Sequence, residues 1–547
     1  MAKQNTKLEL TWIGKDNRPQ LEPRILIEDP EKSYGDPHTE NMLIHGDNLL
    51  ALKALEQKFA GKIKCIYIDP PFNTGAAYEH YEDGLEHSIW LSMMQDRLEM
   101  LRVLLRTDGL IFVQIDYREG ARLKVLMDEI FGETCFKNEI VVRRGTKNVQ
   151  SQFETIDALA TGHDSILLYA KSSDTRLPKL QALAEESEPG KWDTFWRGTD
   201  RRTMRYEIFG IRPQSGQWRW SETRAARAKK NYEDYLEEFN PSMALDEYYG
   251  LRLQETGEKL NFVRFGPEKN VQYYVPPRNY KILSDVWMDI RTSGRVTDFS
   301  HEKHEELIER IIRWASKYGD IVLDSFLGSG TTSAVAHKMG RRWIGVEMGN
   351  HCDTLCLPRL QKVCDGTDQG GISEAAAWKG GGGFKYYELA PSLLNQDEHG
   401  NWVISKEYNA DMLAAAMAKQ EGFTYSPSQG VYWKQGYSTE KDFIFTTTNF
   451  LTVKQLDRIH EEMGEDEHLL VCCRKFSAPC RNRYPNIQVK KIPQMLMGRC
   501  EFGREDYSLN IVNLTDLQTA PEFIPPGPEE KPVKPKVKVN PGQGALF

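Results

Sequence analysis

The chain has 547 residues, of which 40% are hydrophobic and 27% are charged, and its formal net charge at pH 7 is −8. This composition predicts a globular protein of about two to four folded units and excludes a uniformly basic, histone-like chain. No apolar run reaches the roughly 18–20 residues that a membrane span requires, and the first residues lack the apolar core of a signal peptide. We therefore expect a cytoplasmic protein without a membrane partner.

Nine cysteines are scattered along the chain. Neither of their two looser clusters, over residues 352–364 and 472–500, has paired Cys-x-x-Cys spacing. In a chain of this length the pattern indicates reduced thiols rather than a disulfide framework or a zinc site. No metal site is therefore predicted.

The first part of the chain changes character after forty residues. Residues 1–40 are polar and rich in proline and lysine, which predicts an N-terminal arm. Over residues 41–170, short apolar runs alternate with amphipathic helices. We expect strands over 64–68, 110–115, 139–142 and 165–170, and helices over 88–107 and 119–131.

This alternation disappears over residues 171–284, which are aromatic, basic and irregular. Between Lys191 and Lys230, eleven Lys or Arg residues stand against four Asp or Glu, a local net charge of +7 in an acidic chain. A basic island of this kind indicates one face that binds a polyanion. A solvated basic surface explains the charge alone equally well.

The alternation resumes over residues 285–390. We expect a helix over 303–317, a strand over 321–324, a helix ending at 339 and a strand over 343–346. Short loops between such elements predict an α/β fold with a doubly wound, Rossmann-like sheet. Residues 396–520 repeat a strand–helix–strand pattern and predict a small C-terminal α/β domain, while the Lys- and Pro-rich residues 521–547 predict a disordered tail.

A glycine-rich turn follows the strand expected over 321–324. It reads Asp324-Ser325-Phe326-Leu327-Gly328-Ser329-Gly330-Thr331 and opens a helix. Glycines let the backbone approach a ligand closely, and a helix N-terminus offers free N–H groups to an anion. Glu347 ends the next strand, where a carboxylate can accept hydrogen bonds from ribose hydroxyls. A glycine turn alone also serves strand–helix packing, but the whole pattern favours a nucleoside site.

A second motif, Asp69-Pro70-Pro71-Phe72, ends the strand expected over 64–68. The prolines restrict the backbone at the carboxyl end of a strand, where α/β sheets place their ligands. The Asp69 carboxylate and the Pro70 carbonyl can both accept hydrogen bonds from one amino group. Phe72 offers a flat face on which a flipped base can stack. An ordinary strand-to-loop turn capped by aspartate would show the same residues.

The order of the two motifs resembles that of the permuted, beta-class amino-group DNA methyltransferases, in which the catalytic tetrad precedes the cofactor-binding turn and a target-recognition domain lies between them. The Asn-Thr-Gly extension after Phe72 is similar to that of type III modification subunits. The resemblance covers about residues 40–390. It implies a catalytic half over 41–170, a target-recognition domain over 171–284 and an S-adenosylmethionine-binding half over 285–390.

Family roles carried onto matching positions assign catalysis to Asp69, Pro70, Pro71 and Phe72. The resemblance implies that Asp47 contacts the adenine of S-adenosylmethionine and that Glu347 contacts its ribose. The methionine side would be shaped by the turn, at Asp324, Phe326, Gly328, Gly330 and Thr331. The helix before the turn often begins with Lys-Pro in this family, whereas His304 follows Lys303 here, which leaves the role of this lysine open.

The insert over residues 171–284 is the expected DNA-reading part of the chain. Its tryptophans Trp192, Trp196, Trp218 and Trp220 are either stacking or core residues, and for any single tryptophan the core is favoured. Arginine can contact phosphates or read guanine edges. The residues expected to bind DNA are Arg201, Arg202, Arg205, Arg219, Arg224, Arg227, Lys229 and Lys230.

These features predict a site-specific methyltransferase that modifies adenine N6 in duplex DNA by base flipping, as the modification subunit of a restriction-modification or phage-defence system. A cytosine-N4 methyltransferase is one alternative, although an Asp at the head of the tetrad disfavours it. A catalytically idle DNA-recognition subunit is the other.

The expected partners are double-stranded DNA, a second copy of the chain and a restriction or helicase subunit. The final residues Gln543–Phe547 also resemble peptides that bind the replication sliding clamp, although a five-residue match can arise by chance.

Overall fold

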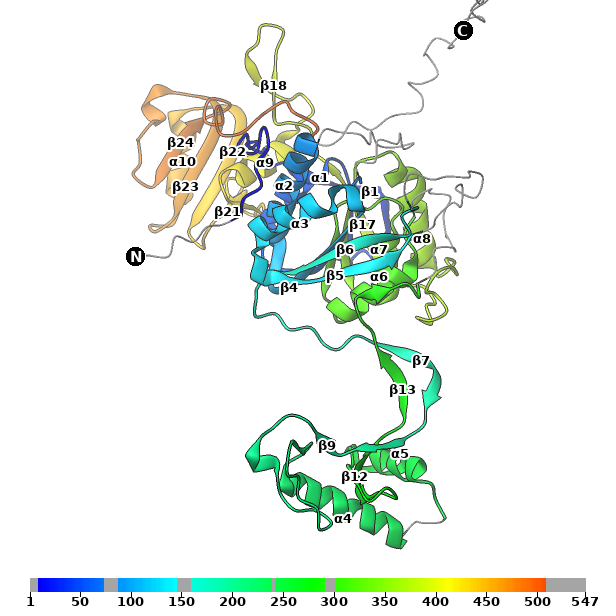
Figure 1. The fold of residues 1–547 in the computed structure, drawn as a ribbon. Helices are drawn as coiled ribbons and strands as arrows, with labels where there is room; N and C mark the ends of the chain where they lie inside the picture. The colour runs from blue at the N-terminus through cyan, green and yellow to red at the C-terminus, as the bar shows by residue number, and fades with distance from the viewer. Residues whose placement is uncertain (1–7, 73–86, 145–158, 239–241, 291–301, 508–547) are drawn as a thin grey trace, which may run out of the picture.

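The computed structural model describes residues 8–72, 87–144, 159–238, 242–290 and 302–507 (Figure 1). Its largest element is a ten-stranded sheet with the strand order β1-β17-β2-β16-β15-β3-β4-β6-β5-β14. The strands are β1 (Leu26–Gly35), β2 (Met42–His45), β3 (Ile63–Ile68), β4 (Leu105–Ile115), β5 (Phe136–Arg143), β6 (His163–Ala170), β14 (Val286–Trp287), β15 (Ile321–Asp324), β16 (Arg342–Glu347) and β17 (Gly383–Leu389).

The centre of the sheet is parallel, from β17 through β2, β16, β15 and β3 to β4. Its strands are apolar on both faces. Ile66 and Leu323 face one core cluster, while Cys65 and Val322 face the other. Strands that are covered on both faces are expected to read as continuous apolar runs, as these do.

Helices cover both faces of this sheet (Figure 1). Because their apolar side chains belong to opposite core clusters, the predicted α/β class is confirmed. One face carries α1 (Asn48–Phe59), α2 (His87–Leu104) and α3 (Tyr117–Phe131), and the other carries α6 (Glu305–Ala315), α7 (Thr331–Lys338) and α8 (Leu357–Asp365).

The structure corrects the sequence-based boundaries in two places. The arm expected over residues 1–40 contains β1, which pairs antiparallel with β17 at the edge of the sheet. β1 was not predicted because it is an edge strand with charged, half-exposed side chains, whereas the prediction relied on the continuous apolar residues of buried strands. The helix expected to reach residue 107 ends at Leu104 instead, since Leu105 already pairs with Ile63 of β3.

Residues 171–284 leave the main body through a two-stranded ribbon, β7 (Gln181–Glu188) with β13 (Arg278–Ile282) (Figure 1). The unit beyond the ribbon was expected to be irregular, yet it contains two helices, whose narrow apolar stripes gave little signal. Its elements are β8 (Lys191–Thr194), β9 (Trp196–Arg197), β10 (Gln217–Trp218), α4 (Glu222–Glu238), α5 (Leu245–Thr256), β11 (Val263–Phe265) and β12 (Val271–Val275).

The C-terminal unit is built on a five-stranded sheet, as the predicted α/β pattern requires. It docks on α1, where Lys419 Nζ donates to Ala54 O at 2.6 Å and Gln57 Nε2 donates to Phe423 O at 2.9 Å. Its elements are β18 (Leu394–Gln396), β19 (Trp402–Ile404), α9 (Ala410–Gln420), β20 (Thr424–Tyr425), β21 (Gly436–Tyr437), β22 (Asp442–Leu451), α10 (Val453–Glu462), β23 (His468–Phe476) and β24 (Ile487–Lys491).

Over the described ranges, no helix is both long enough and apolar enough to cross a bilayer.

Candidate active site and nucleic-acid interface

The two sequence motifs meet at one edge of the sheet. β3 and β15 are neighbouring parallel strands, with Cys65 opposite Val322. Asp69 and the turn after Asp324 therefore leave the sheet on the same side, and the negative charge of Asp69 is close enough to raise the pKa of Asp324. Open α/β sheets bind ligands at this carboxyl edge.

Asp69 presents two different oxygens. Its Oδ2 forms an ion pair with Lys303 Nζ. Its Oδ1 is buried and has no hydrogen-bond partner among the described residues. Burial raises the pKa of Asp69, and the Lys303 ammonium opposes that rise. One oxygen is thus held by a cation, and the other is left for a hydrogen-bond donor.

The backbone after Asp69 is fixed by its neighbours. Pro70 is buried, and Trp90 Nε1 on α2 donates to Pro71 O at 2.8 Å. Phe72 packs against the core cluster beneath α1 to α3, and Lys303 Nζ lies 5.4 Å from the centroid of its ring. The Asn-Thr-Gly extension of the motif lies outside the described residues.

Asp324 braces the glycine-rich turn from within. Its Oδ1 accepts the Phe326 N–H at 2.9 Å, and its Oδ2 accepts the Thr332 hydroxyl at 2.6 Å. Burial raises the pKa of Asp324 to about 7, and the charges of Asp69 and Glu347 add to the rise. The turn itself needs glycine, because Gly328 and Gly330 have φ angles of 58° and 81°.

Glu347 ties the next strand to the same turn. Its Oε2 accepts the Gly328 N–H at 2.7 Å, and its Oε1 accepts the N–H groups of Met348 and Gly349, both at 2.9 Å. His351 Nε2 lies 3.1 Å from Oε1. The side chain is buried at the end of β16, at the carboxyl edge that also holds Asp69.

Asp47 lies at the same edge, because β2 runs parallel to β16. It caps α1 by accepting the Leu50 N–H at 2.9 Å, and its second oxygen accepts the Tyr507 N–H at 3.0 Å. Arg97 lies 3.6 Å from it and donates to Tyr507 O at 3.1 Å. The structure therefore brings a segment 460 residues away in sequence to a predicted cofactor residue, a contact that sequence reasoning missed.

Asn48 and Arg97 were also missed. Asn48 Nδ2 donates to Ser325 O of the glycine-rich turn at 2.8 Å, and Arg97 Nε donates to Asn48 Oδ1 at 2.5 Å. Both side chains are buried. The sequence did contain one signal for this contact. Arg97 lies on the apolar face of α2, and because a buried charge requires a polar partner, it indicates a contact with another part of the chain.

A buried ion network supports the turn from the α6 side. Arg359 on α8 donates to Ser329 O at 3.1 Å and to Thr331 Oγ1 at 2.9 Å. The same guanidinium pairs with Glu302 at 2.9 Å and with Glu305 at 2.8 Å. Lys338 also pairs with Glu305, at 3.0 Å. No sequence motif marked this network.

The residues predicted to bind DNA fall into two groups. Arg205, Arg219 and Lys229 are half-buried and already bonded within the unit; Arg219, for example, donates to Thr194 O at 2.9 Å. Trp218 is buried, as the core interpretation favoured. The exposed residues are Arg201, Arg202, Arg224, Arg227 and Lys230.

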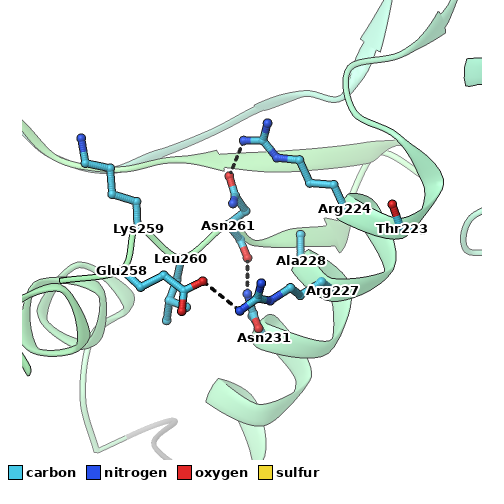
Figure 2. A pocket seen from close by; sticks show the side chains of 9 residues that line it. All are labelled: Thr223, Arg224, Arg227, Ala228, Asn231, Glu258, Lys259, Leu260 and Asn261. Atoms are coloured by element: carbon cyan, nitrogen blue, oxygen red, sulfur yellow. Dashed lines mark hydrogen bonds and ion pairs between the residues drawn. The ribbon is translucent and has the colours of Figure 1, made fainter. Parts of the chain in front are cut away.

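Two of the exposed arginines line one hollow of about 410 Å³ between α4 and the chain before β11 (Figure 2). Arg224 donates to Asn261 Oδ1 at 2.9 Å and lies over the Trp220 ring at 4.4 Å, whereas Arg227 donates to Glu258 at 2.8 Å. Lys259 also lines the hollow. The charged side chains that line the hollow are therefore three cations and one anion, Glu258.

All nine cysteines lie in the described residues as free thiols, eight of them buried. Within the described part of the chain, no His, Cys, Asp and Glu side chains are grouped so that they could hold a metal ion.

In comparisons with known proteins, the matches are to DNA methylases and to restriction-modification proteins. A family model described as DNA methylase matches residues 63–355, just over half of the chain. The probable type III restriction-modification enzyme HindVI Mod subunit of Haemophilus influenzae is 34% identical over 413 residues, which cover 66% of this chain and 55% of that protein.

Two further relatives are more distant. The type III EcoP15I Mod subunit of Escherichia coli is 26% identical, over 71% of this chain and 72% of that protein. The type II methyltransferase M.EcaI of Enterobacter cloacae is 30% identical, over 56% of this chain and 66% of that protein. The match to the Haemophilus protein thus spans little more than half of its length.

Proposed function

Because this chain belongs to the DNA methylase family, we propose that it transfers a methyl group from S-adenosylmethionine to the N6 amine of an adenine flipped out of duplex DNA. The observation that carries the proposal is the pairing of β3 with β15, which puts the Asp69 carboxylate beside the glycine-rich turn. A carboxylate at that edge can accept a hydrogen bond from the amino group that receives the methyl group.

An exocyclic amine is a weak nucleophile because its lone pair is delocalised into the base. If its two N–H groups donate to Asp69 Oδ1 and Pro70 O, the lone pair points away from both. The carboxylate also stabilises the positive charge that develops on nitrogen as it gains the methyl group, and the nitrogen then loses one proton, for which Asp69 is the adjacent acceptor. Asp69 Oδ1 suits this role, since it is buried and has no partner among the described residues. Phe72 provides the stacking face for the base.

The residues around the glycine-rich turn fit S-adenosylmethionine, which when bound supplies a methyl group on a positively charged sulfonium. The buried Glu347 carboxylate is suited to ribose hydroxyls. Ser325 Oγ is buried and has no hydrogen-bond partner in the described ranges, so it offers a polar atom to a ligand. We assign the remaining cofactor contacts to Asp47, Asp324, Phe326, Gly328, Gly330 and Thr331.

We assign residues 41–170 and 285–390 to the two halves of a circularly permuted methyltransferase domain, and 171–284 to target recognition. The ribbon β7–β13 supports this assignment, because it carries the basic unit away from the sheet (Figure 1). The hollow lined by Arg224 and Arg227 is the proposed contact with the DNA backbone (Figure 2). We assign residues 396–520, of which the structure describes 396–507, to an accessory domain.

Adenine rather than cytosine is favoured by the Asp at the head of the tetrad and by the similarity to type III Mod subunits. The same similarity supports a modification role beside a restriction partner. A second copy of the chain in the assembly stays a prediction. The clamp-like peptide Gln543–Phe547 lies outside the described residues and stays a prediction.

Sequencing that detects modified bases tests the proposal. The chain would be expressed in a host without DNA methylation of its own, with the D69A variant as the control. We expect N6-methyladenine in one short motif with the parent and none with the variant. Modified cytosine would support the alternative acceptor, and unmodified DNA would support an idle recognition subunit.

A further inference from the structure

Lys303 lies where the two halves of the site meet, although the sequence assigned it no role. Its ammonium pairs with Asp69 Oδ2 and lies 5.4 Å from the centroid of the Phe72 ring. Only about a fifth of its side chain is exposed. A lysine that touches two of the proposed catalytic residues is placed to act on both.

The backbone that carries Lys303 is anchored to the cofactor side of the site. Its neighbour Glu302 pairs with Arg359 at 2.9 Å, and Arg359 in turn donates to Ser329 O and Thr331 Oγ1. Glu305, in the first turn of α6, is held by Arg359 and by Lys338. The lysine therefore projects from a braced segment, not from a free loop.

We propose that Lys303 is a positioning residue for methyl transfer: it holds Asp69 by Oδ2 as an ionised carboxylate, so that Oδ1 is kept for the amino group of the base. This inference rests on the proposed function. Oδ1, which has no hydrogen-bond partner in the part of the chain that the structure describes, supports it, because the ion pair uses the other oxygen.

The surroundings explain why a cation is needed there. Burial raises the pKa of Asp69, and the negative charge of Asp164 on β6 adds to the rise. Asp324 on β15 and Tyr67 on β3 also lie close enough to interact with the Asp69 charge. Lys303 opposes these effects. Its loss raises the pKa of Asp69 further and lowers the fraction that is ionised near neutral pH.

The test compares K303Q and K303R with the parent, with D69A and with K441Q, which removes an exposed lysine that pairs with Asp466 in the C-terminal unit. Tritiated methyl transfer from S-adenosylmethionine to unmethylated genomic DNA gives kcat and KM between pH 5.5 and 9. Calorimetry gives cofactor affinity, and circular dichroism checks the fold.

For K303Q we expect kcat to fall by about 10- to 100-fold, as when a partner that orients an active-site group is removed. The KM for DNA and the cofactor affinity should stay near the parent values. The acid limb of the kcat profile should move to higher pH, so that activity partly returns under alkaline conditions. K303R should restore most of kcat and the parent profile, and K441Q should match the parent.

Three results would overturn the inference. The first is a K303Q variant whose pH profile of kcat matches that of the parent. The second is a K303Q variant that no longer binds the cofactor. The third is a K303R variant whose kcat is as low as that of K303Q. If K303Q fails to fold, the K303R variant alone tests the inference: a pH profile of kcat like that of the parent supports it, and the loss of that profile overturns it. Should D69A remain active, the proposed function fails instead, and the two failures are thereby distinguished.

Discussion

At the scale of single residues, the account depends on Asp69. We expect D69A to lower turnover by at least about 10²–10³-fold, because the variant removes the acceptor that stabilises charge on the amine. Cofactor affinity should be largely unchanged, since the glycine-rich turn has its own supports in Asp324 and Glu347. Single-turnover methylation and calorimetry measure the two effects. Turnover equal to that of the parent would remove Asp69 from the mechanism.

Asp324 gives a prediction about pH. Its pKa of about 7 lies above the ordinary value, so burial favours the protonated form in the folded protein. The associated stability is complete below the ordinary pKa, near 4, and is lost as the pH rises through about 7. The free energy of unfolding of the parent should fall over this window relative to that of D324N, which cannot titrate. Urea unfolding at several pH values measures the difference, and parallel curves would contradict the assignment.

At the scale of elements, the contact of α8 with the glycine-rich turn depends on Arg359. R359M leaves Glu302 and Glu305 buried without this cation and should lower the free energy of unfolding by about 3–5 kcal/mol. Cofactor affinity should fall as well, because Ser329 and Thr331 lose their donor. Urea unfolding and calorimetry measure both.

The matched control for R359M is R458A, which breaks an exposed pair with Glu462 on α10 and should cost about 0.3–0.5 kcal/mol. If R359M were no less stable than R458A, the network would not support the turn.

The helix α4 carries the proposed contact with DNA. We expect the double variant R224A/R227A to bind duplex DNA more weakly. The slope of the logarithm of the binding constant against the logarithm of the salt concentration should become less steep by about two, roughly one for each lost phosphate contact. The hollow that the two arginines line is the structural reason (Figure 2). Fluorescence anisotropy over a range of salt concentrations measures the slope, with R458A as the control. An unchanged slope would place the DNA elsewhere.

The elements also show what a sequence can and cannot reveal. β15 and β16 were predicted nearly to the residue, because fully buried strands are continuous apolar runs. β1 was missed, since its pairing with β17 joins residues about 350 positions apart, from Leu26 with Leu389 to Gly35 with Gly383, and leaves its side chains half exposed. Likewise, Asp69 and Glu347 could be proposed as site residues because each follows a strand within a recognisable local pattern. The partners Arg97 and Arg359 carry no motif and act through long-range contacts, and Lys303 stands only in a partial match to the Lys-Pro start of a helix.

At the scale of the whole molecule, the structure joins the C-terminal unit and the basic unit to one ten-stranded sheet, and within the described residues only the C-terminal unit contacts the edge that holds Asp69 and Asp47. The C-terminal unit reaches that edge through Tyr507, whose N–H bonds to Asp47 and whose carbonyl accepts from Arg97. The basic unit extends from the sheet on its ribbon (Figure 1). The proposed function assigns duplex DNA to the basic unit and the flipped base to the pocket beside Asp69.

Methylation of adenine N6 by this protein is tested most directly by identifying the modified nucleoside. Purified parent and D69A proteins would each be incubated with unmodified genomic DNA and S-adenosylmethionine, and the digested nucleosides would be analysed by mass spectrometry. The account predicts N6-methyldeoxyadenosine from the parent and none from D69A. Equal amounts from both proteins, or no methylated nucleoside from a parent protein that binds the cofactor, would contradict it.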